Sequence, residues 1–190
     1  MKKLFLPFFI CLLFSACTTV NVDKTTQYTA KGEMYFKLGD AKKSLKYLNK
    51  SLEADPSNAE AYLSRGSLLY SVGEYDAAIE DFNAVLENDK NVPELYAALG
   101  AAYAAKKDYK SARDNLLKSL ELYPNNVAAL NSLGGVYYST GNYNAAIEQY
   151  TKALNLRPVP AIYYMRGMCY QTMGMDEEAK KDFSLSGYTE

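Results

Sequence analysis

The chain has 190 residues, 48% of them hydrophobic, and its 21 Lys and Arg against 22 Asp and Glu leave a formal charge of −1. This composition is typical of a folded domain and excludes an intrinsically disordered chain. The charge argues against nucleic-acid binding, because such proteins need a basic surface to displace the counterions around phosphates. The chain contains no His, which excludes Ser-His-Asp and Cys-His catalytic groups and histidine zinc sites.

The N-terminal segment, residues 1–16, has the pattern of a signal peptide. Lys2 and Lys3 precede a short apolar stretch, Leu4 to Phe14. This stretch is well short of the roughly 20 residues that a membrane-spanning helix needs. We therefore expect residues 1–16 to direct export.

The end of this segment, Leu13 to Cys17, resembles the bacterial lipobox, in which the Cys is acylated and becomes the mature N-terminus. Phe14 stands where the lipobox usually has Leu, so conventional cleavage after Ala16 with a free Cys17 is the alternative. Lipidation would anchor the protein in a lipid bilayer through Cys17, and residues 17–24 would form the lipidated N-terminus and a short tether.

The remainder of the chain is built from five similar repeats. A Gly recurs at a nearly constant interval, at Gly32, Gly66, Gly100, Gly134 and Gly167. A period this regular predicts a solenoid of stacked repeats. Twelve positions after each Gly a small residue occurs, and four positions later a large one follows. The small residues are Ser44, Ala78, Ala112, Ala146 and Ala179, and the large ones are Leu48, Phe82, Leu116, Tyr150 and Phe183. This pairing predicts two helices that approach closely and fill the gap with the large side chain.

The pattern resembles the tetratricopeptide repeat family, whose unit carries an aromatic residue, Leu-Gly, Tyr, Ala-x-x-x-Phe and Pro. The aromatic position holds Tyr28, Tyr62, Tyr96, Leu130 and Tyr163, and the closing Pro is Pro56, Pro124 and Pro158, with Lys90 in its place in the second repeat. The resemblance implies an all-α fold, a right-handed α-solenoid of five helix-turn-helix repeats after the lipoprotein signal peptide. The repeats are expected at residues 25–58, 59–92, 93–126, 127–159 and 160–190, the last one incomplete and without a capping helix.

Each repeat is predicted to divide into two helices at a second Gly, found at Gly39, Gly73, Gly141 and Gly174, with Lys107 in the third repeat. A residue at this place ends a helix in the left-handed conformation. Asp40, Asp108 and Asn142 follow and can accept hydrogen bonds from the free N–H groups of the next helix.

The residue two positions after each first Gly is predicted to be buried, because it is apolar in every repeat. These residues are Met34, Leu68, Ala102, Val136 and Cys169. Cys11 leaves with the signal peptide, so if Cys17 carries lipid, Cys169 has no cysteine partner. We interpret Cys169 as a packed small hydrophobe; a nucleophilic role is the alternative, although the chain has no His to activate it.

The family resemblance implies that a stripe on the first helix of each repeat lines a concave groove that binds peptides. We predict the partner-binding residues to be Phe36, Leu63, Ser67, Tyr70, Ala101, Asn131, Tyr138 and Tyr164. The stripe, which also includes Thr29 and Ala97, has no Lys or Arg and so lacks a basic clamp for an acidic C-terminal peptide. Its small and aromatic residues suit an apolar helix or extended segment. The alternative is that Ala and Tyr are ordinary residues of a degenerate helix surface.

Charge is unevenly distributed along the chain. Residues 23–50 carry seven Lys and a net charge of +4, whereas residues 51–190 carry a net charge of −7. The first repeat could therefore lie against anionic headgroups near the lipidated end. A solvated Lys-rich face is the alternative interpretation.

No catalytic residue, metal ligand or cofactor is predicted. Glu80-Asp81 and Glu177-Glu178 are adjacent carboxylates, and neighbours on a helix diverge by about 100°, so they cannot flank one bond. We therefore expect a non-enzymatic scaffold that binds a segment of an envelope protein. It resembles pilotin-type lipoproteins that assist type IV pilus secretin assembly. Adaptors for peptidoglycan hydrolases or synthases, and a structural module that forms homodimers through its last repeat, are the alternatives. Thr18 is not the Asp that retains some lipoproteins at the inner membrane, which favours the periplasmic face of the outer membrane.

Overall fold

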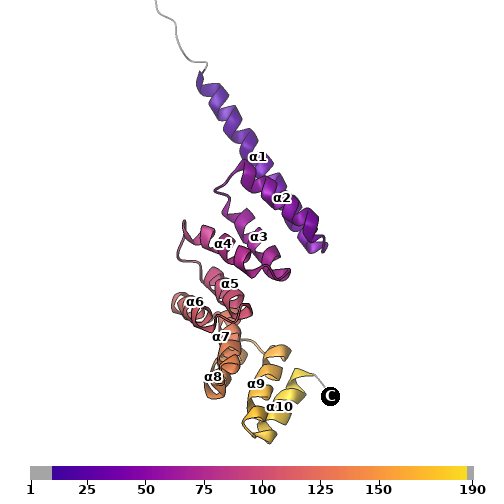
Figure 1. Ribbon diagram of the computed structural model, residues 1–190, viewed down its shortest axis with the longest axis vertical. Coiled ribbons are helices and arrows are strands. Elements are labelled where there is room, and N and C mark those ends of the chain that lie inside the picture. Colours follow the sequence, from indigo (N-terminus) through magenta and orange to yellow (C-terminus); the bar gives the residue numbers. More distant parts are fainter. Residues whose placement is uncertain (1–9, 188–190) are drawn as a thin grey trace, which may run out of the picture. The chain divides into compact units, whose positions relative to one another are not determined.

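The computed structural model describes residues 10–187, with side chains from Lys24 onward. Over this range the protein consists of ten α-helices and no strands (Figure 1), which confirms the predicted all-α fold of helix pairs. The helices are α1 (Ile10–Lys37), α2 (Ala41–Ala54), α3 (Ala59–Ser71), α4 (Tyr75–Leu86), α5 (Pro93–Ala105), α6 (Tyr109–Leu122), α7 (Val127–Ser139), α8 (Tyr143–Leu156), α9 (Pro160–Thr172) and α10 (Asp176–Ser186).

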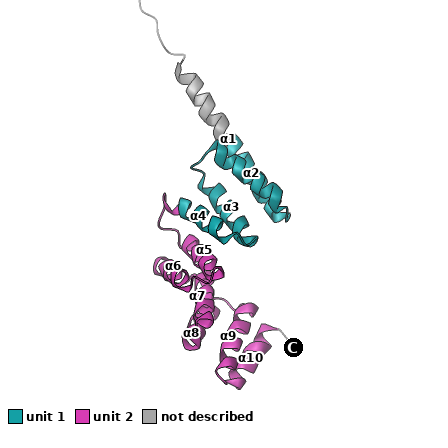
Figure 2. Cartoon of the chain, viewed as in Figure 1, with its two compact units in different colours: residues 1–85 teal, residues 86–190 magenta. Residues whose placement is uncertain are grey.

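The chain forms two compact units, residues 1–85 and residues 86–190 (Figure 2). Unit 1 contains the first two helix pairs up to the end of α4, and unit 2 contains the last three. The predicted signal peptide, Cys17 and most of the tether lie outside the residues whose side chains are described. None of the helices in the described residues combines the length and hydropathy needed to cross a bilayer.

The turn inside each helix pair has the predicted conformation. Gly39, Gly73, Gly141 and Gly174 have φ values of 75°, 89°, 77° and 73°. Lys107 takes the same left-handed conformation, with φ of 64°, and it is the one non-glycine residue in the described part of the chain that does so. The side chains of Asp40, Asp108 and Asn142 each accept a hydrogen bond from the backbone N–H three residues later, which caps α2, α6 and α8.

The two helices of each pair meet where the small and large residues were predicted to pack. A Cβ atom added to Gly32 would lie 2.6 Å from Leu48, and one added to Gly100 would lie 2.5 Å from Leu116. The corresponding distance from Gly134 to the ring of Tyr150 is 2.5 Å. Real Cβ atoms do not approach other carbons so closely, so only Gly allows this contact between the helices.

The joints between successive repeats are of two chemical kinds. At the start of α3 and α7, Asn58 and Asn126 act as N-caps, and their side-chain amides donate to Ser51 and Ser119 of the preceding helix at 3.0 Å. At the start of α5 and α9 a Val is the N-cap without a side-chain hydrogen bond, and Pro occupies the first turn. Pro suits this place because its missing N–H has no partner there in any helix.

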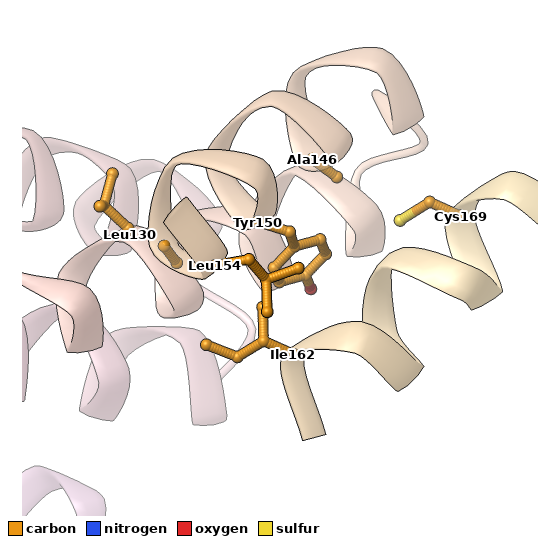
Figure 3. Close-up of a cluster of buried hydrophobic side chains, with 7 residues drawn as sticks. Leu130, Ala146, Tyr150, Leu154, Ile162 and Cys169 are labelled. Carbon is orange, nitrogen blue, oxygen red and sulfur yellow. The ribbon is translucent and has the colours of Figure 1, made fainter. Parts of the chain in front are cut away.

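One apolar core cluster of unit 2 lies between α7, α8 and α9 (Figure 3), with Tyr150, Ile162 and Cys169 buried together. Cys169 is fully buried, and this burial raises the pKa of its thiol to about 11. The thiol is therefore protonated and inert at neutral pH, which agrees with its interpretation as a packed hydrophobe.

The prediction that Met34 is buried was wrong, because 46% of its surface is exposed. The equivalent residues Leu68, Ala102 and Val136 are buried. Within unit 2, Val136 and Cys169 pack in core clusters with residues of the preceding helix pair, whereas no helix pair precedes α1 among the described residues.

Two neighbouring glycines of α7 provide a matched test of the close approach. We expect Gly134→Ala to destabilise the protein by about 1 to 3 kcal/mol, because the new methyl group overlaps the Tyr150 ring. At Gly135 the added Cβ would meet only the Tyr150 hydroxyl, at 3.8 Å, so Gly135→Ala should stabilise α7 by about 0.5 to 1 kcal/mol. Urea unfolding measures both effects, and equal unfolding midpoints would contradict the packing described.

Candidate binding face

The predicted site residues are grouped by unit, and we call them together the helix-A face, because all lie on the first helix of a pair. In unit 1 the face comprises Phe36 on α1 with Leu63, Ser67 and Tyr70 on α3. Leu63, Ser67 and Tyr70 are exposed and Phe36 is half-buried. α1 and α3 contact each other, so these side chains belong to one pair of neighbouring helices.

In unit 2 the helix-A face comprises Ala101 on α5, Asn131 and Tyr138 on α7, and Tyr164 on α9. α7 contacts both α5 and α9. Ala101, Asn131 and Tyr138 are half-buried, and Tyr164 is 38% exposed. The structure thus leaves all eight predicted residues at least partly accessible.

The tyrosines of the helix-A face are held in place by aromatic residues of the second helices. The ring of Tyr70 lies 5.6 Å from that of Tyr75, and the ring of Tyr138 lies 5.5 Å from that of Tyr143. Tyr164 contacts Phe183 of α10 at 5.6 Å. Each ring therefore presents one accessible side and loses little conformational freedom when a partner packs against it.

Two residues predicted on the same stripe are instead buried. Thr29 is 1% exposed, because its hydroxyl lies 2.8 Å from the Ser51 hydroxyl and accepts a hydrogen bond from Asn58 at the joint between α2 and α3. Ala97 is 6% exposed and packs in the core cluster that contains Ala129 of α7. The position three residues before the first Gly borders the next repeat, so a short side chain there is covered.

A partly buried ion pair that the repeat pattern did not predict holds α3 in place. The Arg65 guanidinium donates through Nε and Nη2 to the Asp81 carboxylate at 2.8 and 2.7 Å. Its Nη1 donates at 2.8 Å to Asn49 of the preceding helix α2. The hydrogen bonds to Asp81 raise the pKa of Arg65. Arg65 therefore links its own pair to the preceding one and holds α3, and with it Leu63 and Tyr70, in position.

The same arrangement recurs in the last repeat. Arg166 donates to Asp182 at 2.7 and 2.8 Å and to Thr151 of α8 at 2.9 Å. The sequence does contain a signal for this ion pair. In both repeats a basic residue directly precedes the first Gly, and an Asp follows sixteen positions after that basic residue. The third and fourth repeats have Leu99 and Leu133 at the basic position, and both side chains are buried.

Tyr150 is fully buried beneath the helix-A face of unit 2, and its hydroxyl has no hydrogen-bond partner within residues 24–187. Burial raises the pKa of this hydroxyl, with smaller contributions from Cys169 and Tyr138. Among the described residues, no cluster of His, Cys, Asp or Glu could hold a metal ion. The accessible chemistry of the face is therefore that of aromatic, aliphatic and amide groups, which bind by packing and hydrogen bonding.

Comparison with known proteins identifies the repeat. Three family models described as tetratricopeptide repeat match residues 29–94, 91–158 and 160–186. A crystal structure of MamA shares 30% identity and a TM-score of 0.73, over 86% of this chain and 90% of that one. The chain belongs to the tetratricopeptide repeat family.

Other tetratricopeptide repeat structures share its fold at lower identity. PilF of Pseudomonas aeruginosa has 22% identity and a TM-score of 0.78, over 90% of this chain and 79% of that one. The protein TTC0263 of Thermus thermophilus has 20% identity and a TM-score of 0.72, over 85% and 89% of the two chains. Among curated protein sequences none matches the chain.

The unpaired hydroxyl of Tyr150 provides a test of the core beneath the helix-A face. We expect Tyr150→Phe to stabilise this tetratricopeptide repeat protein by about 1 kcal/mol, because it removes a buried polar group that makes no hydrogen bond. Phe82 and Phe183 already occupy the equivalent position in the second and fifth repeats. The control is Tyr123→Phe at an exposed site, which should change the urea midpoint little. A loss of stability in Tyr150→Phe would mean that the hydroxyl is bonded after all.

Proposed function

We propose that this tetratricopeptide repeat protein is a membrane-anchored scaffold that binds a helix or extended segment of an envelope protein on its helix-A face. The observation that carries the proposal is that, within each unit, the first helices present accessible aromatic and small residues. The proposed anchor is an acyl group on Cys17, supported by the lipobox-like sequence that ends there.

The side chains of the face favour an apolar or aromatic segment. Tyr70, Tyr138 and Tyr164 are preorganised by their contacts with second helices, so a partner gains contact area without ordering them. No Lys or Arg lies among the eight residues of the face, so a carboxylate-bearing tail would find no counter-charge there.

We propose assembly of a type IV pilus secretin as the process served, since an acylated chain made of these repeats resembles pilotin-type lipoproteins. The likeness to PilF, at 22% identity, supports the fold alone. Recruitment of peptidoglycan hydrolases or synthases through the same helix-A face is the second candidate. A self-associating module is the third.

A strain lacking the gene, complemented with variants, tests anchoring and binding separately. Cys17→Ser should abolish labelling by an alkyne fatty acid and release the protein from the membrane fraction, because no other Cys lies at the processing site. Tyr138→Ala with Tyr164→Ala should keep the label but lower the amount of detergent-resistant secretin multimer at least severalfold. Tyr123→Ala is the matched control, since Tyr123 is exposed and lies outside the helix-A face.

These measurements separate the three candidate functions. Normal secretin multimers in both Cys17→Ser and the double tyrosine variant would rule out the secretin proposal. Mislocalised peptidoglycan hydrolases in the double variant would favour the second candidate. Membrane retention of unlabelled Cys17→Ser would contradict lipid anchoring.

A further inference from the structure

The first repeat carries a group of lysines and tyrosines that the helix-A face does not use. We call it the Lys–Tyr face; its members are Tyr28, Lys31 and Tyr35 on α1, and Lys43, Tyr47 and Lys50 on α2. The spacing of three and four residues within each helix places its members on one side of that helix. α1 and α2 lie side by side (Figure 1), and ring contacts between Tyr28, Tyr35 and Tyr47 join the two rows.

The rings of the Lys–Tyr face form a stack with the ammonium groups over it. Tyr35 and Tyr47 are stacked with centroids 5.5 Å apart, and Tyr28 lies 6.3 Å from Tyr47. Lys43 lies 5.1 Å from the centroid of Tyr35, and Lys31 lies 5.6 Å from that of Tyr47. Lys50 lies between two rings, 5.7 Å from Tyr28 and 5.9 Å from Tyr47. These cation–π contacts hold the positive groups at the surface in fixed places.

Carboxylates neutralise little of this charge. Within the described part of the chain, Lys43 forms an ion pair with Asp40 at 2.9 Å, and neither Lys31 nor Lys50 pairs with a carboxylate. Lys24 and Lys46 are exposed on the same two helices and add to the positive potential. Clustered like charges destabilise a folded protein. Packing of the repeat does not require them, because the second repeat has Ala84 where the first has Lys50.

The position of the face in the repeat explains why it is free. In α3 the residue before the first Gly, Arg65, reaches back to Asn49 of the preceding helix. The equivalent residue of α1 is Lys31. No helix pair precedes α1 among the described residues, so Lys31 and its neighbours remain on the surface.

We propose that the Lys–Tyr face docks on the anionic headgroups of a phospholipid bilayer. Ammonium groups are attracted to anionic lipids, and tyrosine rings are favoured at the depth of the headgroups because they are apolar with one polar end. An acidic peptide would neutralise the ammonium groups but would offer no apolar layer for the tyrosine rings. Cys17 precedes Lys24 by seven residues within α1, which places the two about 10 Å apart along the helix axis. The inference rests on the proposed function in one respect: the acyl group on Cys17 would bring the Lys–Tyr face to the membrane.

The absence of Trp from the chain makes a fluorescence test possible. The protein used begins at residue 17 with Cys17→Ser, which keeps every residue with a described side chain and removes the acyl group. Tyr47→Trp reports on the Lys–Tyr face, and Tyr123→Trp reports on an exposed site in unit 2. Circular dichroism checks that both variants keep their helix content.

Vesicles made of two parts phosphatidylcholine and one part phosphatidylglycerol should shift the Tyr47→Trp emission to shorter wavelength and leave Tyr123→Trp unchanged. Pure phosphatidylcholine vesicles should shift neither, and raising the salt concentration should reverse the shift. No shift with anionic vesicles, or an equal shift with soluble polyglutamate, would overturn the proposal.

Neutralising the lysines tests the charge directly. One lysine near an anionic surface contributes about fivefold to partitioning, so Lys31→Gln, Lys43→Gln and Lys50→Gln combined should weaken vesicle binding about a hundredfold. The control combines Lys90→Gln, Lys110→Gln and Lys181→Gln, three exposed sites with the same change in net charge, and should weaken binding less than about twofold. Equal losses in the two triple variants would overturn the proposal. Because this protein carries no acyl group, failure of Cys17 lipidation in cells leaves these results unchanged.

Discussion

The close approach of each first Gly to a large residue of the following helix is the constraint on which the rest of the structure depends. At all five first glycines an added Cβ would fall 2.5 to 2.8 Å from that side chain, so both the distance between the helices and their facing sides are fixed. Once this side is buried, the accessible side of each first helix is determined. The position of the helix-A face is therefore a consequence of this packing.

Polar side chains at the joints between repeats also help to fix each repeat against its neighbour. Asn58 and Asn126 satisfy backbone and hydroxyl groups at two joints, whereas Arg65 and Arg166 span a joint with one guanidinium each. Asp81 and Asp182 are buried, so loss of either arginine would leave an unpaired charge in the core. In a linear array each repeat contacts only its neighbours, and such joints decide how firmly a repeat is held.

The features that recur in every repeat could be predicted from the sequence. Features that depend on a neighbouring repeat, or on its absence, could not. The glycine positions, the left-handed turns and the N-caps Asp40 and Asp108 follow from local rules that each repeat obeys by itself. Met34 was misjudged because its burial depends on a preceding repeat. Thr29 and Ala97 were misjudged because short side chains at a joint are covered by the next repeat. The Lys–Tyr face could not be derived from composition alone, since it requires knowing which lysines and rings meet across α1 and α2.

Binding of an envelope protein to the helix-A face is tested most directly by site-specific photo-crosslinking. A benzophenone amino acid is placed at Tyr138, at Tyr164 or at the exposed Tyr123, and growing cells of the native host are irradiated. Binding at this face predicts adducts of one common size from Tyr138 and Tyr164, which lie on the neighbouring helices α7 and α9, and none from Tyr123. The absence of adducts from the first two sites, or equal yield at Tyr123, would contradict it.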